Sequence, residues 1–115
     1  MPAGWSALAD AVLQLEMELR QLGLWSREPP VRWRLESEVP FCVDTLAFDQ
    51  WLQWVFIPQV ISLLERGETL PGECRIQPMG EEAFAHLGRR RGGLLAALGQ
   101  IDHCAAMLAK DVAQF

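Results

Sequence analysis

The side chains in this sequence that could bind a metal or form a disulfide are few and widely spaced. The three cysteines, Cys42, Cys74 and Cys104, are an odd number and show no CxxC spacing, which predicts neither a disulfide framework nor a zinc site. His103 stands beside Cys104, but adjacent residues of a helix point about 100° apart and do not converge on one ion. We therefore expect a surface histidine beside a buried thiol, no metal or other cofactor, and a reduced, cytoplasmic setting.

The sequence also lacks a recognisable set of catalytic residues. It contains no GxSxG, HExxH or GxxxxGK motif, and no GxGxxG between a strand and a helix. The carboxylates Asp44, Asp49 and Asp102 stand apart from one another in the sequence. These features favour a non-enzymatic interaction module. One alternative stays open, an enclosed polar site for a small ligand around Asp44, Thr45 and Gln53.

Arg89, Arg90 and Arg91 form the one strongly basic run, and two glycines follow it. Cations at the N-terminus of a helix oppose the helix dipole, and a bound phosphate would remove that penalty. The run is therefore a candidate site for an anion or RNA. Short basic runs without a fixed geometry are more often solvated connectors.

Length and charge limit the remaining classes of function. The chain has 115 residues, half of them hydrophobic, which is enough for one domain with its own core. It carries 10 Lys and Arg against 15 Asp and Glu, a net charge of −5, so direct binding of nucleic acid is disfavoured. The first apolar run has no basic leader and holds Asp10, Glu16 and Glu18, so we expect no signal peptide. Polar residues from Asp49 to Glu65 interrupt the most apolar stretch, so we expect no membrane span. The oligomeric state stays open.

Apolar residues at alternating spacings of three and four predict a long helix at each end of the chain. The first seam is Trp5, Leu8, Val12, Leu15, Leu19 and Leu22, and the last is Leu94, Leu98, Ile101, Ala105, Leu108, Val112 and Phe115. Gly23 is expected to end the first helix. Between them, residues 68–80 are predicted to be a loop and residues 81–87 a short helix that Gly88 closes.

The most apolar stretch predicts a central helix over residues 48–66, with Gly67 as its stop. Pro58 cannot donate a backbone hydrogen bond, so we expect a kink there. The polar stripe should change sides near that residue. Together these elements predict an all-α antiparallel bundle of four helices, one of them short, in a single domain of residues 1–115.

Residues 24–43, here named the strap, form a connection rich in proline and tryptophan. Alternation of apolar and basic residues over 31–35 predicts an extended segment. Val31, Trp33 and Leu35 should face the bundle, and Arg32 and Arg34 should face water. Long ordered connections are often functional. The strap could cover one face of the bundle, or Trp25 and Trp33 with the arginines could form a docking surface of the composition favoured at protein interfaces.

The central stretch resembles the YqcC-like family of small bacterial proteins, whose core runs close to PFxxDT and then, after a short spacer, EWLQWVFIP. Here the matching segments are residues 40–45 and 50–58, with further agreement at 70–72 and 101–102, so the resemblance covers most of the chain. Gln50 stands where the family has glutamate, and Ala47 stands where a capping residue is usual. Asp44 or Thr45 is therefore the predicted cap of the central helix.

The resemblance implies a helical bundle of uncharacterised function, encoded beside a tRNA pseudouridine synthase in many genomes. We therefore expect a protein partner, with that synthase as the candidate and the strap as the contact surface. The competing hypothesis is an RNA- or phosphate-binding domain that uses Arg89, Arg90 and Arg91.

Overall fold

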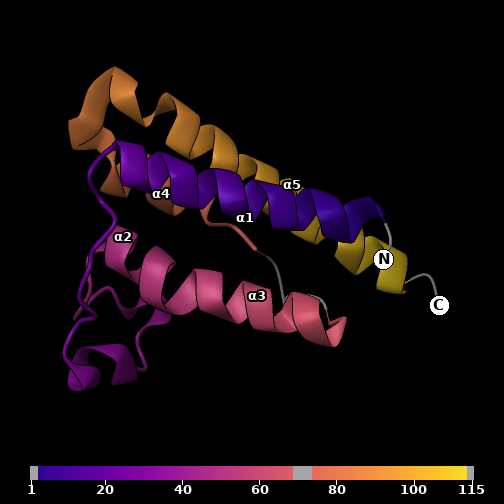
Figure 1. The fold of residues 1–115 in the computed structure, drawn as a ribbon, viewed down its shortest axis with the longest axis horizontal. Coiled ribbons are helices and arrows are strands. Elements are labelled where there is room, and N and C mark those ends of the chain that lie inside the picture. Colours follow the sequence, from indigo (N-terminus) through magenta and orange to yellow (C-terminus); the bar gives the residue numbers. More distant parts are fainter. Residues whose placement is uncertain (1–2, 69–73, 114–115) are drawn as a thin grey trace.

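Helices pack as an antiparallel bundle in the computed structural model, which describes residues 3–68 and 74–113. The helices are α1 (Ala3–Gln21), α2 (Phe48–Trp51), α3 (Ile57–Arg66), α4 (Gln77–Ala83) and α5 (Gly92–Ala113). A π-helical turn, η3 (Leu52–Phe56), joins α2 to α3, and three 3-10 turns are η1 (Arg32–Glu36), η2 (Pro40–Cys42) and η4 (Ala85–Arg91). In Figure 1, α1 runs antiparallel to both α3 and α5. The predicted all-α bundle is confirmed, and no helix within the described ranges is long and apolar enough to cross a bilayer.

The core lies mainly between α1 and α5, where the two predicted seams meet. Leu15 and Leu19 of α1 and Leu94, Leu98 and Ile101 of α5 are completely buried. Phe56, Val60 and Phe84 close the core from the central helix and from the end of α4. The predicted seam residues Val112 and Phe115 lie outside the part of the chain whose side chains are described. His103 is exposed beside the buried Cys104, as predicted.

Two helices end at a left-handed glycine. Gly23 has φ 73°, and the N–H of Leu24 donates to the carbonyl of Leu19 at 2.8 Å. Gly67 has φ 70°, and the N–H of Glu68 donates to the carbonyl of Leu63 at 2.8 Å. Both ends have the hydrogen-bond pattern of the Schellman motif, so the predicted stops of α1 and α3 are confirmed.

The irregular part of the central helix lies one turn before the position predicted for it. The N–H of Ile57 donates to the carbonyl of Leu52, which adds a residue to that turn. The extra residue rotates the side chains that follow relative to those before it. Gln53 is consequently buried, whereas Gln59 and Glu65 on α3 are exposed. The polar stripe therefore changes sides across Leu52–Phe56, not at Pro58.

The prediction for residues 68–88 was wrong at the start of the helix. α4 begins at Gln77 rather than at Glu81, with Pro78 in its first turn, where a missing N–H costs nothing. The helix ends before Ala85, and Gly88, with φ 58°, bends the following 3-10 turn η4. Residues 69–73, which include the family-like residues 70–72, lie outside the described ranges.

The strap is ordered but not extended where extension was predicted. Residues 32–36 form the 3-10 turn η1, which has three residues per turn and does not keep alternating residues on one side. Val31 is 56% exposed and Trp33 61% exposed, while Leu35 is half-buried. Trp33 therefore points to solvent and not into the bundle.

Leu15→Ala should lower the free energy of unfolding by about 2–5 kcal/mol, because it leaves a cavity in the α1–α5 core. Leu13→Ala, in the same helix at a side chain that is 59% exposed, should change it by less than about 0.5 kcal/mol. Urea denaturation of both variants measures the difference. Equal losses would mean that α1 does not pack on α5 in this register.

Candidate functional site

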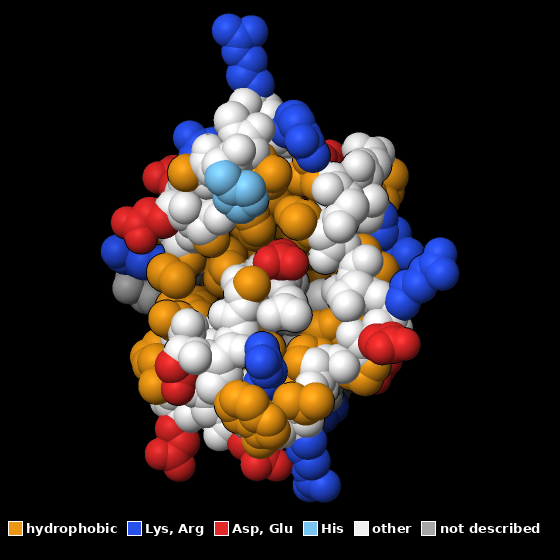
Figure 2. All heavy atoms as spheres, turned by 90° about the vertical axis from the view of Figure 1, so that its left-hand side faces the viewer, with side chains coloured by type: hydrophobic (Ala, Val, Ile, Leu, Met, Phe, Trp, Pro, Cys, Tyr) orange, Lys and Arg blue, Asp and Glu red, His pale blue; other side chains and the backbone are white. Residues whose placement is uncertain are grey.

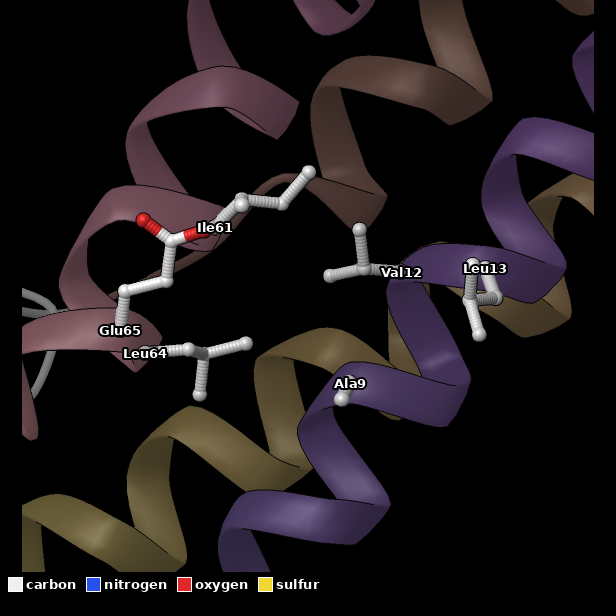
Figure 3. Close-up of a pocket in the computed structure, with 6 residues that line it drawn as sticks. All are labelled: Ala9, Val12, Leu13, Ile61, Leu64 and Glu65. Carbon is white, nitrogen blue, oxygen red and sulfur yellow. The ribbon is translucent and has the colours of Figure 1, made fainter.

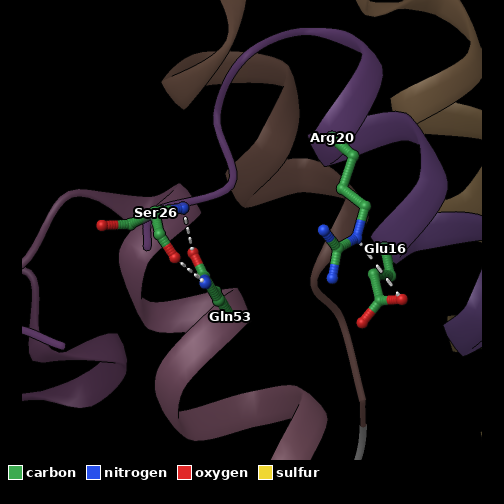
Figure 4. Close-up of polar contacts among 4 residues, drawn as sticks. All are labelled: Glu16, Arg20, Ser26 and Gln53. Carbon is green, nitrogen blue, oxygen red and sulfur yellow. Dashed lines mark hydrogen bonds and ion pairs between the residues drawn. The ribbon is translucent and has the colours of Figure 1, made fainter. Parts of the chain in front are cut away.

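The strap is attached to the bundle through the buried amide of Gln53. The N–H of Ser26 donates to Oε1 of Gln53 at 2.8 Å, and Nε2 of Gln53 donates to the carbonyl of Ser26 at 2.6 Å (Figure 4). Gln53 is 5% exposed, and apolar neighbours could not form hydrogen bonds with its amide. The backbone of Ser26 pairs with both the oxygen and the nitrogen of that amide. The sequence placed Gln53 in a candidate polar site, and the structure uses it to hold the backbone of the strap.

Trp25 is the second point of attachment. It is half-buried and packs against the core, and the guanidinium of Arg20 lies 4.6 Å from its ring centroid. Nε of Arg20 also lies 3.6 Å from a carboxylate oxygen of Glu16, as Figure 4 shows. A tryptophan held on one face by the core and on another by a cation has little surface left for a partner.

Asp44 and Thr45 fix the far end of the strap. Oγ of Ser37 donates to Oδ1 of Asp44 at 2.6 Å, and Oγ1 of Thr45 donates to the carbonyl of Arg34 at 2.7 Å. Neither residue caps the central helix, which corrects that prediction. The helix begins at Phe48, and the side chain of Gln50 accepts the N–H of Ala47 at 3.1 Å.

The side chains of the strap that remain exposed between these attachments are mainly apolar or basic. We define the strap surface as Val31, Arg32, Trp33, Arg34, Val39 and Val43. Its three valines are 42–57% exposed and Trp33 is 61% exposed. Arg34 lies 5.2 Å from the Trp33 ring centroid, and Nε of Arg32 lies 3.2 Å from Glu36. Figure 2 views the molecule from the side where the strap lies in Figure 1, and large hydrophobic side chains reach the surface there between charged ones.

The arginine run is only partly available as an anion site. Nη1 of Arg91 donates to the carbonyl of Glu81 at 2.7 Å, so this side chain fastens η4 to α4. Arg89 and Arg90 are exposed. The run lies in η4, immediately before α5 begins at Gly92.

The sequence treated Asp102 as an isolated carboxylate, and this missed its role. Its two oxygens accept the N–H groups of Ile76 and Gln77, each at 2.9 Å. A carboxylate of α5 thus caps the N-terminus of α4, where a negative charge is favourable. The Gln77–Pro78 pair was a usable signal for the helix start, but the partner lies 25 residues away in the sequence and no local pattern identifies it.

Two groups have protonation equilibria that the fold shifts. Burial raises the pKa of Cys74 to about 12, and the hydrogen bond to Asp102 and the charge of Asp102 act in the same direction. Burial raises the pKa of Asp49 above its ordinary value, although the backbone N–H groups of Asp49 and Gln50 and the charge of His86 oppose it. A thiol with so high a pKa is a poor nucleophile at neutral pH. Across the described residues, no three His, Cys, Asp or Glu side chains are grouped as a metal site would need.

The chain belongs to the YqcC-like family. The family model described as "DUF446: tRNA pseudouridine synthase C" matches residues 7–104. The uncharacterized protein YqcC of Escherichia coli is 36% identical over 97 residues, 84% of this chain and 86% of that protein. An uncharacterized protein of Haemophilus influenzae is 47% identical over 71 residues, 62% of this chain and 67% of that protein. The solution NMR structure of E. coli YqcC has a TM-score of 0.72 at 33% identity, covering 87% of this chain and 88% of that one.

A longer relative carries the name of an enzyme. The tRNA pseudouridine synthase C of Pectobacterium carotovorum is 36% identical over 62 residues, which are 54% of this chain but 16% of that protein. The similarity is therefore to a small part of the longer protein.

Gln53→Ala should lower the free energy of unfolding by about 1–3 kcal/mol, because it leaves the N–H and carbonyl of Ser26 without their partner. It should also make the strap more sensitive to trypsin, since the strap contains Arg27, Arg32 and Arg34. Gln59→Ala, at an exposed glutamine of α3, is the matched control and should have neither effect. Trypsin digestion of the native proteins, followed by mass spectrometry, measures the rate of cleavage within the strap. Digestion at equal rates in both variants would contradict the attachment through Gln53.

Cys74 should stay protonated in the folded protein far above neutral pH. Its folded pKa of about 12 exceeds the ordinary value of 9.0, so its contribution to stability is complete below about pH 9 and is lost as the pH rises towards 12. Site-resolved alkylation by iodoacetamide should therefore still accelerate in the native protein above pH 10, where the urea-unfolded chain has reached its plateau. Asp102→Asn should lower the apparent pKa, because it removes the neighbouring charge. A native plateau near pH 9 would refute this environment for the thiol.

Proposed function

We propose that this chain is a non-enzymatic protein-interaction module that acts as an accessory partner of a tRNA pseudouridine synthase and binds it through the strap surface. The observation that carries the proposal is Trp33, a large aromatic side chain 61% exposed on a segment held in place by Gln53 and Trp25. Tryptophan and arginine are enriched among the residues that dominate protein interfaces. A rigid segment also loses little conformational entropy when it binds.

The choice of partner rests on the relatives. A protein named tRNA pseudouridine synthase C contains a region similar to this chain, and that region is only 16% of its length. Two regions that are joined in one longer polypeptide are good candidates to bind each other when they occur on separate chains. The family description carries the same name. Both findings support a role beside such a synthase, and neither bears on the surface used.

The charge of the chain supports contact with the enzyme rather than with its RNA. A net charge of −5 disfavours a polyanion such as RNA as the direct ligand. The alternative, RNA or phosphate binding through Arg89, Arg90 and Arg91, has a weaker basis because Arg91 is engaged by Glu81. The other alternative, a ligand site at Asp44, Thr45 and Gln53, has polar atoms that are already bonded within the chain.

Trp33→Ala should weaken the complex with the synthase of the native host by about 30-fold or more, the change expected for an interface hot spot. Its melting temperature should change little, because most of the ring is in solvent. Arg32→Glu with Arg34→Glu should also weaken the complex. Met107→Ala, at a side chain of α5 that is 48% exposed, is the control and should bind as wild type. Isothermal titration calorimetry, with and without ribonuclease treatment, measures the affinity of the wild type and the three variants for the synthase.

Three outcomes would count against the proposal. The purified proteins could fail to associate, or Trp33→Ala could bind as tightly as wild type. Alternatively, Arg89→Ala, Arg90→Ala and Arg91→Ala together could abolish a salt-dependent interaction with RNA, in which case the nucleic-acid hypothesis replaces this one.

A further inference from the structure

An apolar groove lies between α1 and α3, away from the strap. It has a volume of about 280 Å³ and is lined by Ala9, Val12, Leu13, Ile61, Leu64 and Glu65. Figure 3 shows three of these side chains on α1 and three on α3, on opposite sides of the opening. The groove exists because α1 packs closely along α5 but contacts α3 at only a few positions.

Apolar side chains that line the groove, or continue from it along α1, are exposed. Leu13 is 59% exposed, Met17 51% and Ile61 45%. Ala9, Leu13 and Met17 are spaced by four residues, so they form a stripe on α1 beside the seam that meets α5. On α3, Ile61 and Leu64 form the facing wall. Contiguous apolar surface of this kind marks interaction sites, whereas isolated exposed apolar residues do not.

A carboxylate lies at the edge of the groove. Glu65 is one of its lining residues, whereas Asp10 is exposed on α1 outside the lining set. Among the described residues, no cation lies within ion-pair distance of Asp10 or Glu65. Glu16, farther along α1, is already paired with Arg20. The groove therefore has an apolar floor and one carboxylate, Glu65, at its α3 edge.

We propose that this groove binds an amphipathic helix of another protein, one with an apolar face and lysine or arginine on its flanks. A helix laid into a groove between two helices presents apolar residues at positions i, i+3, i+4 and i+7, and a flanking cation reaches Glu65 at the edge. A second copy of this chain fits less well. A two-fold symmetric interface sets the same patch against itself, so it would bury two copies of Glu65 at the edge of the groove without supplying a cation from the lining residues. This inference does not depend on the synthase or on the strap surface.

A selection experiment tests the occupant without assuming a partner. A displayed library of 18-residue helical peptides, with a fixed apolar seam and flanking positions randomised among Lys, Glu, Gln and Ser, would be selected on the full-length protein. The recovered peptides should be rich in lysine at the flanks. Their amide chemical-shift changes should map to α1 and α3.

Substitutions then separate shape from charge. Leu13→Gln with Ile61→Gln should weaken the selected peptides at least tenfold while the melting temperature is retained, since both side chains are largely in solvent. Met107→Gln is the matched control and should bind as wild type. Glu65→Lys should reverse the preference, so that a peptide with glutamate flanks binds better than its lysine counterpart.

Any of four results overturns the proposal. These are failure to recover a binder, recovered peptides without basic flanks, shift changes that map to the strap, and an unchanged preference after the charge reversal. Sedimentation equilibrium tests whether a second copy of this chain occupies the groove. A dimer that dissociates on Leu13→Gln with Ile61→Gln would assign the groove to a second copy and refute the heterologous helix.

Discussion

The position of the strap depends on one buried amide. Gln53 donates to and accepts from the backbone of a single residue, Ser26, and it is almost completely removed from water. An amide in that position without partners would cost several kcal/mol relative to water, so the strap has one favourable place on the bundle. Gln53 faces the strap because the π-helical turn rotates this part of the central helix relative to α3. The irregular turn and the ordered strap are therefore parts of one arrangement.

Uneven packing around α1 follows from the same arrangement. α5 covers one side of α1 along most of its length, whereas the central helix meets α1 over a short distance and packs on the strap at its α2 end. Leu13 and Ile61 are left at the surface, so exposed apolar side chains lie at the groove as well as on the strap.

The helices could be predicted from the sequence because their signals are local. Alternating spacings of three and four identified the α1 and α5 seams, and Gly23 and Gly67 identified two helix ends, since only glycine adopts a left-handed conformation at low cost. The predictions were wrong where residues far apart in the sequence determine the local structure. The start of α4 depends on Asp102, and the orientation of Trp33 depends on how Gln53 and Thr45 hold the strap at its two ends. Alternation at 31–35 is compatible with a strand, but no neighbouring strand is present among the described residues to pair with it.

Charge gives the two exposed apolar surfaces different properties. On the strap surface, Arg32 is opposed by Glu36 at 3.2 Å and Arg34 lies over Trp33, so binding there would rest on apolar area and depend little on salt. At the groove, Glu65 has no ion-pair partner among the described residues, and exposed charges are screened over about 8 Å at physiological ionic strength. Binding there would be faster at low salt, because complementary charge acts mainly on the association rate. A strongly salt-dependent association rate therefore points to the groove, and a salt-insensitive affinity lost with Trp33 points to the strap, even when both surfaces contact the same partner.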